Sequence, residues 1–214
     1  NADHTVNYDG VGGSDDSSSV SFSNAGQANS LTIDDVETLN FSVDGLQNSV
    51  DTFDAADVET LNIAGSGDLG LGVVAFNTAA LTTVDANTAT GDITLGGTGS
   101  EVPNTLETFT GGTGDDTLHL AAGDVGASDS FDGVDGTDTV RLDGGTATAA
   151  VASIVGFERL LIADTSNTHD LATFSNSVLT DVLVSATGGT AADVDNIDGQ
   201  TITFTGTAPA GVDL

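Results

Sequence analysis

The phrase Val-Glu-Thr-Leu-Asn-Phe occupies residues 36–41 and returns as Val-Glu-Thr-Leu-Asn-Ile over residues 58–63. Within each copy, apolar and polar residues alternate, which is typical of a strand with one buried face. Related phrases begin at Leu106, as Leu-Glu-Thr-Phe, and at Phe157, as Phe-Glu-Arg-Leu-Leu-Ile. A repeat at this spacing predicts a solenoid, in which each coil buries its apolar face against the next coil.

A second group of phrases places phenylalanine five residues before another apolar residue, over residues 53–58, 76–81 and 174–179. Equivalent positions of a solenoid stack, so Phe53 and Phe76 are expected to meet in successive coils. All the phenylalanines are expected to belong to the core. They are Phe22, Phe41, Phe53, Phe76, Phe109, Phe131, Phe157, Phe174 and Phe204.

Short alternating runs separated by Gly, Asp and Asn continue along most of the chain. They predict an all-β fold, a parallel β-helix or β-roll with coils of roughly 22 residues, formed by residues 1–214 as one elongated segment of a longer chain. A β-sandwich is the alternative, because it too is built from short strands and regular turns. Short helices are expected only near residues 54–58, 77–81 and 146–153.

The charge of the chain is strongly unbalanced. Its 28 Asp and 5 Glu face two cationic side chains, Arg141 and Arg159, and the formal net charge is -31. Yet 38% of the residues are hydrophobic, so the chain has a core to bury while its charges repel one another. An external cation would resolve this conflict, and aspartates in glycine-rich turns favour an oxygen-binding ion, Ca²⁺. Solubility at high salt is the alternative explanation of the acidity.

The run Gly-Gly-Thr-Gly-Asp-Asp-Thr-Leu-His over residues 111–119 matches the calcium-binding nonapeptide G-G-x-G-x-D-x-U-x. Its glycines permit a sharp turn, its carboxylates supply charged oxygens, and the following apolar residue begins a strand. A degenerate copy follows at residues 133–138, one expected coil later, so the two turns are expected to stack and share a coordination shell. Water-facing turns are the alternative. The candidate metal ligands are Gly111, Gly112, Thr113, Gly114, Asp115, Asp116, Asp132, Gly133, Asp135, Gly136 and Asp138.

These residues resemble the RTX (repeats-in-toxin) proteins, and the phrases at 36–41 and 58–63 are similar to those of RTX-containing S-layer proteins and large adhesins of Gram-negative bacteria. The resemblance implies calcium-induced folding after type I secretion, with residues 105–145 as the calcium-binding part. RTX nonapeptides normally run in tandem, whereas the two copies here are separated by other sequence. The resemblance therefore implies a few calcium sites inside a β-helical structural protein.

Further acidic groups are weaker candidates for cation sites, with solvated turn carboxylates as the alternative at each. They are Asp9, Asp15 with Asp16, Asp34 and Asp35 with Glu37, Asp54 with Asp57, and Asp193, Asp195 and Asp198. The histidines His4, His119 and His169 share no metal-ligand spacing, and His119 is expected to face solvent because it alternates with two leucines.

No nucleophile elbow, zinc-protease helix, P-loop or dinucleotide fingerprint occurs, so the chain is not expected to be an enzyme. Two arginines cannot neutralise a nucleic-acid backbone, and no apolar run is long enough for a membrane-spanning helix. Nucleic acid and membrane insertion are therefore not expected.

The expected function is that of a calcium-dependent extracellular or cell-surface structural segment of an S-layer, adhesin or surface fibre. Self-association into a lattice or filament is expected, with cell-surface polysaccharide as a possible partner. Two alternatives are an RTX appendage of a secreted enzyme and a glycan- or ice-binding module.

Overall fold

The computed structural model describes residues 3–6, 13–24, 26–121, 126, 128–143, 154–163, 168–170, 178–185, 193–195 and 199–205. Within these residues, all regular secondary structure is β-strand. Most of the strands form two parallel sheets, and the chain alternates between these sheets over residues 3–162.

Sheet A has ten strands, which follow one another in the order of the chain. They are β1 (Asp3–Val6), β3 (Gly26–Ile33), β5 (Asn48–Asp54), β7 (Leu69–Asn77), β9 (Ile93–Leu95), β11 (Thr117–Ala121), β13 (Thr139–Asp143), β15 (Arg159–Ile162), β17 (Asp181–Val184) and β19 (Thr201–Phe204). Sheet B has seven strands in the same sense: β2 (Ser17–Ser23), β4 (Thr38–Asp44), β6 (Thr60–Gly65), β8 (Thr83–Ala89), β10 (Thr108–Thr110), β12 (Ser130–Asp132) and β14 (Ile154–Val155). A small parallel pair joins β16 (Thr168–Asp170) and β18 (Asp193–Asp195).

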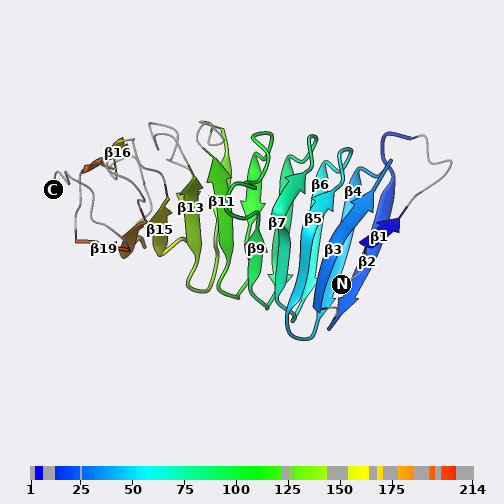
Figure 1. Cartoon of the computed structure of the whole chain (residues 1–214), viewed down its shortest axis with the longest axis horizontal. Helices are drawn as coiled ribbons and strands as arrows, with labels where there is room; N and C mark the ends of the chain where they lie inside the picture. The colour runs from blue at the N-terminus through cyan, green and yellow to red at the C-terminus, as the bar shows by residue number, and fades with distance from the viewer. Residues whose placement is uncertain are drawn as a thin grey trace.

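The coils succeed one another along the longest axis of the molecule, with the first and last strands of sheet A at opposite ends (Figure 1). Thr38 pairs with Thr60 in sheet B, and Thr117 pairs with Thr139 in sheet A, so partners in both sheets are separated by the predicted coil length. The parallel pairing and this spacing confirm the predicted β-solenoid and exclude the β-sandwich, whose sheets are antiparallel.

The repeated phrases open strands, but not always in the same sheet. The copies that begin at Val36, Val58 and Leu106 lead into β4, β6 and β10 of sheet B. The copy at Phe157 leads into β15 of sheet A. Both sheets have one buried and one outer face, so the same alternation suits either of them.

The core lies between the two sheets and is lined by the inward residues of each strand. Phe22, Phe41, Phe53 and Phe76 contact one another edge to face, with successive ring centroids 5.2, 5.9 and 5.6 Å apart. The expected contact of Phe53 with Phe76 is thus confirmed. Each such pair adds about 0.5–1.5 kcal/mol to the burial of its rings.

The other core phenylalanines give a mixed result. Phe109, Phe131 and Phe157 are buried as expected. Phe204 is 38% exposed on β19, the last strand of sheet A, so its assignment to the core was wrong. Phe174 lies outside the described residues.

The helices expected near residues 54–58 and 77–81 are absent, because these segments are strand ends followed by turns. One amide in each segment, Val58 N or Leu81 N, closes a single turn by bonding three residues back, and other amides bond to the neighbouring coil. Ala55 N donates to Asn77 O at 2.9 Å, and Ala80 N donates to Ala56 O at 3.2 Å. Residues 146–153 lie outside the described part of the chain.

Candidate metal site: the glycine–aspartate corner

The two glycine–aspartate turns, residues 111–116 and 133–138, stack at the corner where sheet B passes into sheet A. We call these two turns, together with Glu158, the acid corner. Asp135 N donates to Gly112 O at 3.2 Å, and Thr137 N donates to Asp115 Oδ1 at 2.8 Å. The two turns therefore lie in adjacent coils, as their spacing along the chain predicted.

An inner ladder of hydrogen bonds runs through this corner. Ile93 N donates to Asp116 Oδ1 at 2.8 Å, and Asp116 N donates to Asp138 Oδ1 at 2.7 Å. Asp138 N then donates to Glu158 Oε2 at 2.8 Å. Each carboxylate thus accepts a backbone N–H from the coil before it. Sequence reasoning did not include Glu158, although it directly precedes a strand as Asp116 and Asp138 do.

An outer ladder lies beside the inner one and runs in the opposite direction. Asp92 N donates to Asp68 Oδ1 at 3.1 Å, and Asp115 N donates to Asp92 Oδ1 at 2.8 Å. The carboxylate of Asp115 in turn accepts the N–H of Thr137. Each of these aspartates accepts from the coil after it. Asp92 and Asp115 are exposed, so their charge remains hydrated.

The carboxylates of the inner ladder are buried. Asp116 and Asp138 are both 0% exposed. Asp116 uses both oxygens, because Gly112 N donates to its Oδ2 at 2.8 Å. Asp138 uses only Oδ1, and its buried Oδ2 has no hydrogen-bond partner. An unpartnered buried carboxylate oxygen is costly, so this atom would be stabilised by a bound proton or cation.

The pKa values of these two groups reflect the same environment. Burial raises the pKa of Asp116 to about 6, although the N–H bonds from Gly112 and Ile93 oppose the shift. Burial raises the pKa of Asp138 to about 7, and the nearby carboxylates of Asp116, Glu158 and Asp115 add to the shift. Near neutral pH the corner therefore gains from a bound proton or a bound cation.

Glycine is required where the turns approach each other most closely. A Cβ at Gly133 would lie within 3.0 Å of both Asp138 Oδ2 and the carbonyl oxygen of Gly156. Gly136 has φ +141°, and a Cβ there would collide with the carbonyl oxygen of Gly114. The corner is thus lined by backbone and carboxylate oxygens, with glycine hydrogens facing them.

The remaining candidate side chains are not buried with this ladder. Thr113, Asp115 and Asp135 are exposed, and Asp132 Oδ1 accepts the N–H of Val134 at 3.0 Å. Among the described residues, no group of three or more acidic or histidine side chains has the geometry of a metal site. An ion bound to Asp116 and Asp138 would therefore take further oxygens from backbone carbonyls and water.

The weaker acidic candidates make hydrogen bonds of their own. Asp16 N donates to Glu37 Oε2 at 2.7 Å, and Asp35 N donates to Asp57 Oδ2 at 3.4 Å. Asp9 and Asp198 lie outside the described residues, and the side chains of Asp193 and Asp195 are not described.

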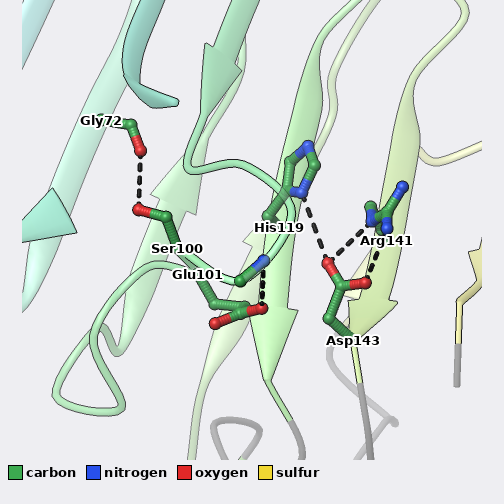
Figure 2. A network of polar contacts seen from close by, with 7 residues as sticks. Gly72, Ser100, Glu101, His119, Arg141 and Asp143 are labelled. Carbon is green, nitrogen blue, oxygen red and sulfur yellow. Dashed lines mark hydrogen bonds and ion pairs between the residues drawn. The ribbon is translucent and has the colours of Figure 1, made fainter. Parts of the chain in front are cut away.

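His119 does not face solvent, so that expectation was wrong. It lies on the outer face of β11, as the alternation predicts, but it is only 9% exposed. The segment before β10 folds over it, as Figure 2 shows. Its Nδ1 lies 3.5 Å from Asp143 Oδ2, and Asp143 is held by Arg141 through two hydrogen bonds of 2.7 Å.

Comparison of the chain with protein-family models, curated proteins and solved structures gave no match. The part of the chain that the structure describes contains no helix long and apolar enough to cross a membrane.

Proposed function

We propose that this chain is a calcium-dependent structural segment of an extracellular or cell-surface protein, such as an S-layer, adhesin or surface fibre of the RTX type. Its coils form a stiff rod, and calcium at the acid corner joins adjacent coils. The observation that supports this proposal most directly is the buried, unpartnered Oδ2 of Asp138.

The donor chemistry of the corner suits calcium. The available ligands are carboxylate and carbonyl oxygens, and Ca²⁺ takes six to eight of these at about 2.3–2.6 Å. Asp116 and Asp138 would hold the ion, which would supply the positive charge that this buried pair lacks. The described residues near this corner offer no cation of their own that contacts either carboxylate.

The number of acidic ligands also bears on where the protein acts. A site with few carboxylates that is completed by carbonyls and water is weak, in the range of about 10⁻⁴–10⁻³ M that extracellular calcium modules use. Such a site fills where calcium is abundant. We therefore place the protein outside the cell, after secretion by the type I route that the RTX resemblance implies.

The test is a calcium titration of the whole chain, with magnesium as the control. Far-ultraviolet circular dichroism and the thermal midpoint are measured at pH 7.5, starting from chelated protein. Calcium should raise the midpoint and magnesium should not, because magnesium demands a compact octahedral shell. An equal thermal midpoint in chelator and in millimolar calcium would refute the proposal that calcium stabilises the fold.

Self-association is tested separately, by negative-stain microscopy and light scattering with and without calcium. Ordered arrays or filaments that require calcium would support the structural role. Monomers under every condition, together with an intact calcium response, would leave a calcium-braced appendage and refute the assembly.

A further inference from the structure

The segment between β9 and β10 crosses the outer face of sheet A. We call residues 96–105 the clasp. Gly97 and Ser100 form an antiparallel bridge at its tip, with N–O distances of 2.7 and 3.0 Å. Two bonds then join the clasp to strands on either side. Ser100 Oγ donates to Gly72 O of β7 at 2.8 Å, and Val102 N donates to His119 O of β11 at 3.0 Å.

The clasp is itself largely buried, and it covers His119 of β11. Ser100 is 7% exposed, Val102 is 2% exposed and His119 is 9% exposed. The Nδ1 atom of His119 is buried without a well-formed hydrogen bond, since its nearest carboxylate oxygen is 3.5 Å away. Figure 2 shows the imidazole between the clasp and Asp143.

We propose that the clasp is a proton-sensitive element, which lies closed over His119 while this side chain is neutral and opens when the side chain takes up a proton. The inference goes beyond the proposed function and does not depend on calcium.

The charged groups around His119 explain why the closed clasp disfavours an imidazolium. Among the described residues, Glu101 approaches from the clasp, and Asp143 and Arg141 approach from β13. The carboxylate of Asp143 already makes two bonds to Arg141, whose charge offsets much of the attraction that Asp143 would offer to an imidazolium. Burial is the largest cause that lowers the pKa of His119, followed by Arg141, while Asp143 and Glu101 oppose them.

The sign of the pH effect follows from this lowered pKa. The open clasp exposes His119, whose pKa then returns towards 6.5, so the open form binds the proton more tightly than the closed form. Well above pH 6.5, at pH 7.5 for example, His119 is mostly neutral in both forms, and the closed form is favoured as before. At pH 5.0 protonation can increase the open population by up to about 30-fold, the limit reached if the closed form excludes the proton entirely.

The test is amide hydrogen exchange of the full chain by NMR between pH 7.5 and 5.0 at constant calcium, with rates corrected for intrinsic exchange. Protection of the Val102 amide should fall several-fold and by at most about 30-fold. The Thr60 amide, which donates to Glu37 O at 2.9 Å in the far sheet, is the internal reference and should not follow it.

Two variants separate this effect from general acid expansion. His119→Gln cannot take up a proton here, so Val102 protection should become independent of pH. Arg141→Gln keeps the histidine but frees Asp143 to pair with it inside the closed clasp, so the pH response should shrink. Unchanged protection in the native chain, or an equal loss in His119→Gln, would overturn the proposal.

Discussion

Replacing Asp138 by asparagine should stabilise the protein in the absence of calcium. The pKa of this carboxyl rises from 3.8 to about 7 on folding. Above pH 7 the ionised side chain therefore costs the folded state about 4 kcal/mol, at about 1.4 kcal/mol per pKa unit. Asparagine keeps an acceptor for the N–H of Asp116 but puts a buried amide donor in place of the unpartnered oxygen, which costs about 1–3 kcal/mol. The expected net gain is about 1–3 kcal/mol at pH 8.

The pH dependence of this difference is a second signature. A raised acid pKa means that the penalty is complete above pH 7 and disappears as the pH falls towards 3.8, because the folded carboxyl takes up its proton first. Between pH 8 and pH 5 the advantage of Asp138→Asn should shrink by about 2.6 kcal/mol. At pH 5 the variant should be no more stable than the native chain.

The assay is urea unfolding in chelator, followed by circular dichroism at pH 8 and pH 5, and repeated in saturating calcium at pH 8. In calcium the order should invert, because the native chain offers two charged ligands and the variant keeps only Asp116. The matched control is Asp135→Asn, which changes an exposed carboxylate in the same turn and should alter stability by less than about 0.5 kcal/mol. If Asp138→Asn is the less stable protein in chelator at pH 8, the buried carboxylate is not a source of strain and the reasoning fails.

Three further outcomes are expected. Gly133→Ala should lose about 2–4 kcal/mol in a thermal melt, because the new methyl group meets Asp138 Oδ2 and Gly156 O, and an unchanged midpoint would contradict the closeness of the turns. Phe53→Ala should lower the free energy of unfolding in urea by about 3–5 kcal/mol, because its fully buried ring contacts two other phenylalanines. A loss below about 1 kcal/mol would argue against that stack. The chelated native chain should become more stable from pH 8 to pH 5 as Asp116 and Asp138 take up protons, and a urea midpoint that falls over this range would count against the raised pKa values.

The solenoid could be predicted from the sequence because the short repeated phrases show both the alternation of apolar and polar residues and the spacing of one coil. The phrases at 36–41 and 58–63 pair residue by residue in β4 and β6. The assignment of each phrase to a sheet could not be predicted. The copy at Phe157 has the same alternation yet enters sheet A. Alternation shows that a strand has one buried face, but it does not show to which of the two sheets the strand belongs.

The acid corner could be predicted only in outline. The spacing of residues 111–116 and 133–138 predicted that the two turns lie in adjacent coils. It did not predict that neighbouring aspartates within a turn differ in burial. Asp115 faces water and Asp116 is buried. The distinguishing signal is position, because the buried acid directly precedes the strand, as Glu158 also does before β15. The burial of His119 depends on a segment that crosses the sheet, which no strand pattern records.

The inner ladder links successive coils at this corner by the same contact, a backbone N–H that donates to a carboxylate of the next coil. Because the contact repeats, the rod could be shortened by a whole coil. Asp116 precedes Thr117 and Asp138 precedes Thr139, and the two threonines pair in register. If residues 117–138 were deleted, Asp116 would directly precede Thr139 and take the place of Asp138. Its amide would then lie opposite Glu158. The length of the rod could therefore be changed in steps of one whole coil, each about 4.8 Å, while the remaining coils keep their pairing.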